Sequence, residues 1–140
     1  MESTYIVTVQ CEIAKENCPG FYCESAFVKR TGAFKEYPDN GNFRNLTLTC
    51  GGCCGRSIHR KLSKLIKTLK KAEDIDKNQI IVHLSSCMVF DNYHSTPCPH
   101  LDYIKNLIEN KLGLPIKNGT KISSLSAKKR DEGQYESIIN

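Results

Sequence analysis

Three of the chain's eight cysteines stand where a β-strand pattern ends. Cys11 follows the first such segment, Cys50 follows the second, and Cys87 follows the third. Parallel strands present their carboxyl ends at one edge of a sheet, where open α/β sheets build their sites, so we expect these thiols to meet. Thiolates bind soft metal ions and carry out redox and nucleophilic chemistry. The sequence therefore predicts a thiol-based site at this edge.

All the cysteines fall in three loops, at or beyond strand ends or in the first turn of a helix. Cysteines that serve only as small core residues would be scattered along the strands and helices. Four disulfides are not expected, because a protein of the reducing cytosol keeps its thiols free. We expect the thiols to act together. The loops hold Cys11, Cys18 and Cys23; Cys50, Cys53 and Cys54; and Cys87 and Cys98, the last with His94 and His100.

A metal is the first chemistry that this pattern predicts. Cys50-Gly51-Gly52-Cys53 is a C-x2-C pair, a tight chelate for a tetrahedral ion, with glycines that let the backbone turn beneath it. Thiolates select zinc or a 4Fe–4S cluster over magnesium or calcium, and thiol number and spacing leave these two open. The strongest predicted ligands of this metal or cluster are Cys11, Cys50, Cys53, Cys87 and Cys98; Cys18, Cys23, Cys54 and His100 complete the predicted set.

Thiol redox chemistry is an alternative. The Cys50–Cys53 pair lies between a strand and a helix, a placement similar to that in thioredoxin-like proteins. A helix N-terminus stabilises a thiolate and lowers its pKa. The chain could then be a thiol-dependent oxidoreductase, and whether it is an enzyme stays open.

Oxyanion chemistry is a further alternative. Cys50, five intervening residues and Arg56-Ser57 match the C-x5-R-S/T loop of cysteine-dependent phosphatases and some arsenate reductases. Backbone N–H groups and Arg56 would hold the anion while Cys50 attacked it. Asp91 is the conceivable general acid. Three cysteines in one anion-binding loop would be unusual, which counts against this reading.

The four histidines differ in what they predict. His83 lies inside a strand and is expected to be a packed core residue. His59, near the start of a basic helix, could reach the site or be exposed, and His94 in a polar loop is undecided. His100 follows Cys98-Pro99 at a helix start and is the best of the four as a ligand.

Composition bounds the class of protein. The 140 residues carry a net charge of +5, with 39% hydrophobic and 25% charged residues, as in a soluble globular domain. We expect no membrane span, because there is no run of about 18 apolar residues, and a cytoplasmic location, because the N-terminus lacks a signal-peptide pattern. We expect one domain over residues 1–121 and a polar tail over 122–140.

The positive charge is concentrated in one segment. Residues 56–71 hold seven cations and no acid, while apolar residues recur on the opposite helical face. No aromatic residues interleave the cations, which weakens the case for base stacking. We therefore expect a solvated helix face rather than a nucleic-acid interface. The predicted partners are a metal or cluster and, for redox chemistry, a partner protein.

The fold that must position these residues alternates strands with helices, which implies right-handed crossovers and a parallel sheet. We expect an α/β three-layer sandwich, flavodoxin/Rossmann-like, with a small mainly parallel sheet of about four strands. Proline in the last strand predicts an edge position. The expected strands cover about 4–10, 43–49, 79–85 and from 114, and the expected helices about 23–36, 56–72 and 101–112, with a polar loop over 88–99.

The motifs together resemble the CGGC-domain family, small prokaryotic proteins usually described as predicted metal-binding. The resemblance covers about residues 4–121. The matching residues are Cys11, Cys18-Pro19-Gly20, Cys23, Gly32-Ala33-Phe34, Cys50-Gly51-Gly52-Cys53, Gly55, His83-Leu84-Ser85-Ser86-Cys87, Cys98-Pro99-His100, Gly113-Leu114-Pro115-Ile116 and Gly119-Thr120.

This resemblance implies a metal-binding role, and it gives His83 more weight than its strand position does. The chain departs from the family pattern at two positions. Cys54 stands where relatives commonly have proline, which adds a thiol that could be a ligand or a resolving cysteine. Lys121 stands where relatives often have histidine, so any site that uses that histidine is altered.

Overall fold

The sheet is all-parallel, as predicted. The computed structural model describes residues 4–12, 18–51, 56–89 and 98–120. Its four strands pair in the order β2-β1-β3-β4, which puts β4 at an edge. Their bounds are β1 (Thr4–Gln10), β2 (Phe43–Thr49), β3 (Ile80–Leu84) and β4 (Ile116–Asn118).

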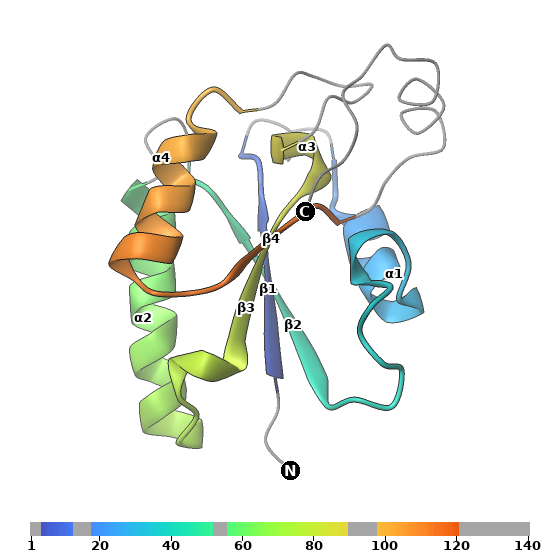
Figure 1. Cartoon of the computed structure of the whole chain (residues 1–140), viewed down its shortest axis with the longest axis horizontal. Coiled ribbons are helices and arrows are strands. Elements are labelled where there is room, and N and C mark those ends of the chain that lie inside the picture. Colours follow the sequence, from blue (N-terminus) through green and yellow to red (C-terminus); the bar gives the residue numbers. More distant parts are fainter. Residues whose placement is uncertain (1–3, 13–17, 52–55, 90–97, 121–140) are drawn as a thin grey trace.

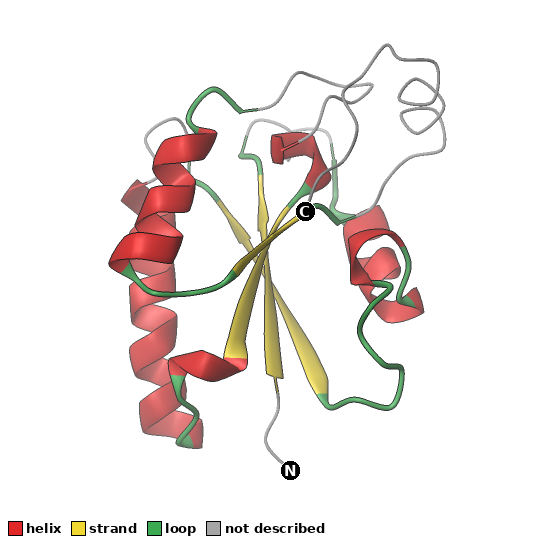
Figure 2. Cartoon of the chain, in the orientation of Figure 1, coloured by secondary structure: helices red, strands yellow, loops and turns green. Residues whose placement is uncertain are grey.

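Helices cover both faces of this sheet, which confirms the α/β sandwich (Figures 1 and 2). The helix α1 (Phe21–Lys29) lies on one face, here named the α1 side. The helices α2 (Arg56–Glu73) and α4 (Leu101–Asn106) lie on the other, named the α2 side. A π-helical segment, Leu107–Lys111, continues α4, and the short α3 (Ser86–Val89) follows β3.

The α2 side buries a mainly aliphatic core. Alternate residues of β1 point toward it, and α2 turns its apolar stripe inward as the 3.6-residue period predicts. Most of its described cations are exposed, as expected of a solvated helix face: Arg60, Lys64, Lys67, Lys70 and Lys71. Lys61 differs, because its ammonium group donates to the Thr49 carbonyl and hydroxyl at 3.1 Å at the end of β2. The buried members of this core are Tyr5, Val7, Val9, Cys50, Ile58, Leu62, Leu69, Ile75, Ile80, Val82, Leu84, Met88, Ile104, Ile108 and Leu114.

The α1 side buries a smaller, mainly aromatic core. The rings of Phe27 and Phe34 meet edge to face with centroids 5.6 Å apart, and Phe34 lies 4.6 Å from the His83 ring. Aromatic pairs in this range contribute about 0.5–1.5 kcal/mol beyond their buried area. The buried hydrophobic members of this core are Ile6, Ala26, Phe27, Phe34 and Tyr37.

The predicted helix over residues 23–36 is wrong in its bounds. Helix α1 ends at Lys29, because Arg30 adopts the left-handed conformation at φ 55° and its N–H bonds back to Ala26 and Phe27. A 3₁₀ turn, Gly32–Phe34, follows it. This break turns the chain so that Phe34 enters the α1-side core.

The other predicted elements match the structure more closely. Strands β1 and β2 have the predicted bounds, and Gly113, at φ 71°, follows the α4 segment as a C-terminal stop. The predicted loop over 88–99 begins within α3, and residues 90–97 lie outside the described part. The predicted tail over 122–140 also lies outside it. None of the described helices combines the length and apolar character needed to span a membrane.

Candidate functional site

Cys11, Cys50 and Cys87 lie at the carboxyl edge of the sheet, with Cys11 between the other two. Cys11 directly follows β1, which lies between β2 and β3. The N–H of Cys50 donates to the carbonyl of Gln10 at 3.0 Å, so Cys50 extends the pairing of β2 with β1. On the other flank, the N–H of Ser85 donates to the carbonyl of Val9 at 2.9 Å. Cys50 therefore directly follows β2, and Cys87 lies in α3, which follows β3, so the two flank Cys11.

Cys87 is the thiol with the best-defined surroundings. Its sulfur lies 3.0 Å from the Ser85 hydroxyl and accepts a hydrogen bond from the Cys11 N–H. Burial raises the pKa of the Cys87 thiol, and the neighbouring thiols Cys11 and Cys23 add to the rise, although these two hydrogen bonds oppose it. The thiol therefore keeps its proton at neutral pH unless a cation displaces it.

Cys50 is the most buried of the described cysteines. Its side chain is 5% exposed, and its sulfur accepts a hydrogen bond from the Glu12 N–H at 3.4 Å. The next residue, Gly51, adopts φ +77°, and a Cβ there would lie 2.2 Å from the Ser57 Cβ. The chain therefore needs glycine here to turn from β2 into α2.

A second polar cluster holds Cys23. The sulfur of Cys23 lies 3.2 Å from the Thr120 hydroxyl, whose oxygen also accepts from the Ser86 N–H. The N–H of Thr120 donates to the Ser86 hydroxyl at 2.9 Å. These bonds tie α1, the start of α3 and the segment after β4 to one another beside Cys87.

Two further predicted residues lie near the loop that precedes α4. The N–H of Cys98 donates to the Met88 carbonyl at 2.8 Å, and the partly buried Cys98 packs against the α2-side core. His100 is exposed at the residue before α4. Cys18 is exposed as well, before α1.

Several candidates of the sequence analysis lie outside the described residues. They are Cys53, Cys54, Asp91 and His94. The backbone of Arg56 begins α2, but its side chain also lies outside the described part. Both the C-x2-C pair and the C-x5-R loop therefore stay predictions.

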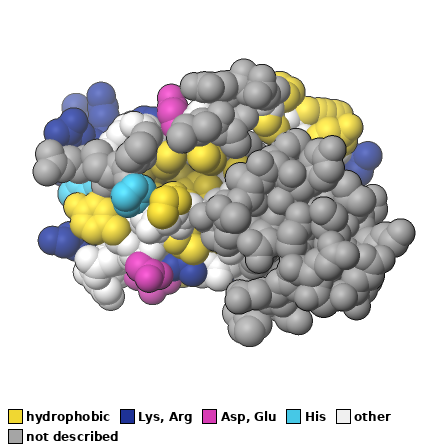
Figure 3. Space-filling model, turned by 90° about the horizontal axis from the view of Figure 1, so that it is seen from above, with side chains coloured by type: hydrophobic (Ala, Val, Ile, Leu, Met, Phe, Trp, Pro, Cys, Tyr) yellow, Lys and Arg dark blue, Asp and Glu magenta, His cyan; other side chains and the backbone are white. Residues whose placement is uncertain are grey.

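Four cysteines share the α2 side of the edge: Cys50 belongs to its core, and Cys11, Cys87 and Cys98 pack against it. Figure 3 looks down onto this end of the molecule. Side chains of the hydrophobic class, which in this figure includes cysteine, lie there beside histidine. Within the described residues, no three histidine, cysteine, aspartate or glutamate side chains are already grouped closely enough to hold a metal ion. A tetrahedral ion would need the thiols drawn to about 3.8 Å apart, given bonds of about 2.3 Å.

His83 confirms the core interpretation. Its side chain is 0% exposed, and both ring nitrogens are hydrogen-bonded. The Gly119 carbonyl, 2.9 Å from Nδ1, can only accept, so Nδ1 carries the proton. The Tyr37 hydroxyl then donates to Nε2 at 2.7 Å. Because no lone pair is left, His83 is not placed to ligate a metal.

The hydroxyl groups that surround the thiols are not among the site residues predicted from the sequence. Ser85 and Ser86 stand between His83 and Cys87, and Thr120 ends the Gly119-Thr120 motif. A signal was present, because these residues belong to the family motifs quoted for the resemblance. Their hydrogen-bond partners could not be predicted from the neighbouring sequence, because the Ser86–Thr120 bonds join residues 34 positions apart.

The fold and the site together define an α/β protein with a thiol-lined edge. The family model of the CGGC domain matches residues 5–121, and the chain belongs to this family. The CGGC domain is a predicted metal-binding domain. Comparisons with curated proteins and with solved structures give no match.

Proposed function

We propose that this protein binds a soft transition metal through cysteine thiolates at the carboxyl edge of its sheet. The predicted cargo is a zinc ion or an iron–sulfur cluster. The observation that carries the proposal is the convergence of Cys11, Cys50 and Cys87, which follow or flank three neighbouring strands. Cys98 packs against the same core and is the fourth described candidate.

The chemistry of this donor set fits a soft ion. Thiolates prefer zinc and iron–sulfur clusters, whereas magnesium and calcium take oxygen ligands. Metal binding must displace the thiol protons, and the raised pKa of Cys87 makes that competition stronger there. Proton release on loading is therefore an expected property of the site.

Cys53, Cys54, Cys23, Cys18 and His100 remain secondary ligands in this proposal. Cys53 completes the C-x2-C chelate with Cys50 and is the first of them to test. The enzyme alternatives that use Cys50 and Arg56 gain no support from the described residues. A nucleophile needs access to substrate, and Cys50 is 5% exposed.

The test begins with anaerobic purification, elemental analysis and a visible absorption spectrum. Iron with acid-labile sulfide and a broad visible band identifies a cluster, and a redox partner protein would then be the next thing to search for. Stoichiometric zinc without colour identifies a zinc site. Protein that stays free of metal after loading with zinc and after cluster reconstitution overturns the proposal.

Single Cys→Ser variants then assign the ligands. Cys11→Ser, Cys50→Ser and Cys87→Ser should each lower bound metal by about tenfold or more, because each removes a soft ligand. Cys18→Ser should lower bound metal less than these three variants, because Cys18 is a secondary ligand that is exposed and not packed against the α2-side core. Equal metal content in all four variants would show that the metal lies elsewhere.

A further inference from the structure

The two outer strands of the sheet, β2 and β4, differ in how well their free sides are protected. Strand β4 has three residues, directly follows Pro115 and carries Lys117, which pairs with Glu36. A short strand, a proline and a lysine are devices that keep an outer strand from pairing with another chain. Strand β2 has seven residues, all in register with β1, and contains neither proline nor lysine. Its one cation, Arg44, instead donates to the Tyr5 hydroxyl at 2.7 Å. Strand β2 is therefore the longer and less protected of the two.

The backbone of β2 has unpaired hydrogen-bonding groups along this free side, here named the β2 edge. The Cys50 N–H donates to the Gln10 carbonyl, so the even-numbered residues of β2 bond to β1. The odd-numbered residues then point their N–H and C=O groups outward. Among the described residues, the outward groups of Asn45 and Thr47 have no hydrogen-bond partner. These donors and acceptors are available to a further strand.

The two ends of the β2 edge are already occupied. At the start of the strand, the Phe43 N–H donates to the Gly41 carbonyl at 3.2 Å. At its end, the Lys61 ammonium group donates to the Thr49 carbonyl at 3.1 Å. The open part is therefore centred on residues 45–47, and it suits an added strand of about five to six residues, the commonest strand length.

The α2 side of the β2 edge is positively charged. Lys61 brings its ammonium group to the end of β2, and Lys64 and Lys71 lie within about 60–80° of it around the helix axis. Both are exposed, and neither has an ion-pair partner among the described residues. Lys70, on another flank of α2, is instead held by two carboxylates at 3.0 Å. The charge beside the β2 edge is therefore free to attract the carboxylates of a partner.

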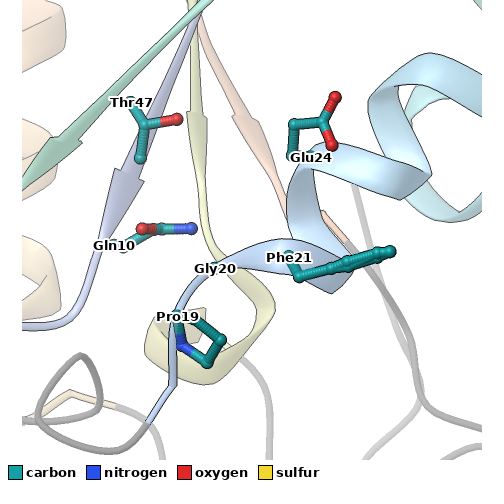
Figure 4. Close-up of a pocket in the computed structure, with 6 residues that line it drawn as sticks. All are labelled: Gln10, Pro19, Gly20, Phe21, Glu24 and Thr47. Carbon is teal, nitrogen blue, oxygen red and sulfur yellow. The ribbon is translucent and has the colours of Figure 1, made fainter.

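The α1 side of the β2 edge adjoins a pocket of about 340 Å³, between β2 and the start of α1 (Figure 4). Thr47 is exposed and belongs both to the β2 edge and to the lining of this pocket. Directly opposite residues of paired strands place their side chains on the same face, so a residue paired with Thr47 would lie on this side. The lining residues are Gln10, Pro19, Gly20, Phe21, Glu24 and Thr47.

Charge discriminates between the two kinds of strand that could be added. A second copy of the chain, paired antiparallel through its own β2, would bring its α2 to the same face of the joined sheet. Lys61 and Lys64 would then lie near their equivalents in the copy, and the chain carries a net charge of +5. Like charges across an interface oppose association, whereas an acidic strand is attracted by the same groups.

We propose that the β2 edge binds an extended acidic segment of a partner protein as an additional antiparallel strand. The backbone of this segment bonds to Asn45 and Thr47, and its acidic side chains lie on the α2 side, beside Lys61 and Lys64. β-Branched side chains alternate with them on the α1 side, where they pair with Thr47. Because β2 leads directly to Cys50, the partner would lie beside the thiols. The proposal does not rest on metal binding by those thiols.

The probe is an acetylated and amidated hexapeptide of alternating glutamate and valine, titrated into the full-length protein as purified. Two-dimensional amide NMR should give saturable shifts centred on Asn45 and Thr47. Hydrogen exchange of these two amides should slow by at least tenfold, because both N–H groups gain an acceptor. Shifts confined to other regions, or exchange that does not slow, would overturn the proposal.

Two methylated peptides test the pairing itself. In the proposed register the valines direct their N–H groups toward β2, whereas the glutamates direct theirs outward. N-methylation of the valines should therefore weaken binding by at least tenfold, and N-methylation of the glutamates should leave it unchanged within about twofold. A valine-methylated peptide that binds as well as the glutamate-methylated one would contradict strand addition.

Three variants of the protein assign the contacts. Thr47→Pro removes an outward N–H at an outer strand, where proline is tolerated, and should weaken peptide binding by at least tenfold. Lys64→Glu should weaken it by about fivefold, and it keeps the test decisive if Thr47→Pro does not fold. Lys111→Glu is the matched control, because it makes the same change of charge at an exposed residue of the helical segment before β4. Equal losses in the two charge variants would mean that only net charge attracts the peptide, which would overturn the proposal.

Sedimentation of the protein without peptide tests the second copy as the occupant. A monomer is expected at micromolar concentrations. A dimer that Thr47→Pro dissociates would overturn the proposal in favour of self-association through β2.

Discussion

On the α2 side of the sheet the buried side chains are mainly aliphatic, whereas on the α1 side they are aromatic and joined by hydrogen bonds. The thiols of Cys11, Cys50, Cys87 and Cys98 belong to or pack against the first core. The second core surrounds His83, which bonds to Tyr37 and to the Gly119 carbonyl. The α2-side core thus supports the candidate metal ligands, and the α1-side core holds the segment that follows β4 in place.

This difference shows how a small sheet can position site residues that are far apart in the sequence. Aliphatic packing tolerates small adjustments, because it has no direction. Hydrogen bonds of a buried histidine fix both distance and angle. The His83–Gly119 bond therefore positions Thr120, whose hydroxyl contacts Cys23 and the Ser86 N–H.

The largest expected effect comes from the aromatic core. Phe34→Ala should lower the free energy of unfolding by about 3–5 kcal/mol, because Phe34 is 0% exposed and packs against Phe27 and His83. Chemical denaturation measures it. Phe21→Ala, at a ring that is 54% exposed, is the control and should change stability by less than about 0.5 kcal/mol. Equal effects would mean that the α1 side has no specific aromatic core.

The next effect probes the turn that leads from β2 into α2. Gly51→Ala combines a positive φ with a clash against Ser57, so we expect a loss of about 2–4 kcal/mol. Gly113→Ala is the matched control: its φ is also positive, at +71°, but its Cβ would meet the flexible end of Lys77 at 3.0 Å. That control should lose only about 1 kcal/mol. Similar losses would show that the contact with Ser57 adds nothing.

A smaller effect isolates the hydrogen bond on the α1 side. Tyr37→Phe removes the donor to His83 Nε2 and leaves a buried acceptor unmet, which should cost about 1–3 kcal/mol. Burial raises the pKa of Tyr37 to about 12, with Glu36 adding to the rise, so the hydroxyl stays a donor at all ordinary pH values. Tyr103→Phe, at a 48% exposed ring, serves as the control in the same denaturation experiment. A loss no larger than in Tyr103→Phe would contradict the role of this bond.

Much of the fold could be predicted because its elements have strong local periods. Strands β1 and β2 were predicted with the observed bounds, and α2 to within one residue. The end of α1 could not be predicted, because Arg30 adopts a left-handed conformation that its residue type disfavours. The packing of Phe34 between Phe27 and His83 accompanies that break, and it is a tertiary effect.

The candidate site could be predicted in outline for a topological reason. Cysteines that follow parallel strands must come to one edge, so Cys11, Cys50 and Cys87 could be grouped without a structure. The hydrogen bonds of Thr120 and the unpaired Oε1 of Gln10 could not be found this way. They depend on how β4 and α1 return to the edge, which no local pattern encodes.

The smallest effect that we predict is a pH dependence of stability, and it tests whether the α1 side needs a neutral histidine. Burial lowers the pKa of His83 in the folded protein below its ordinary value of 6.5. Lys117 also lowers it, while the Gly119 carbonyl and Glu36 act in the opposite direction, and Tyr37 faces the other ring nitrogen. As the pH falls, His83 therefore takes up a proton at a higher pH in the unfolded chain than in the folded protein.

The resulting change of stability has a definite sign. The contribution of neutral His83 is fully present above about pH 6.5 and is lost progressively at lower pH, with a slope of at most about 1.4 kcal/mol per pH unit. Denaturation between pH 7.5 and 5.5 measures it, and His83→Asn should remove this part of the slope. His100→Asn is the control, because that ring is exposed. An unchanged slope in His83→Asn would mean that the histidine can charge without loss, and the α1 side would then be held by aromatic packing alone.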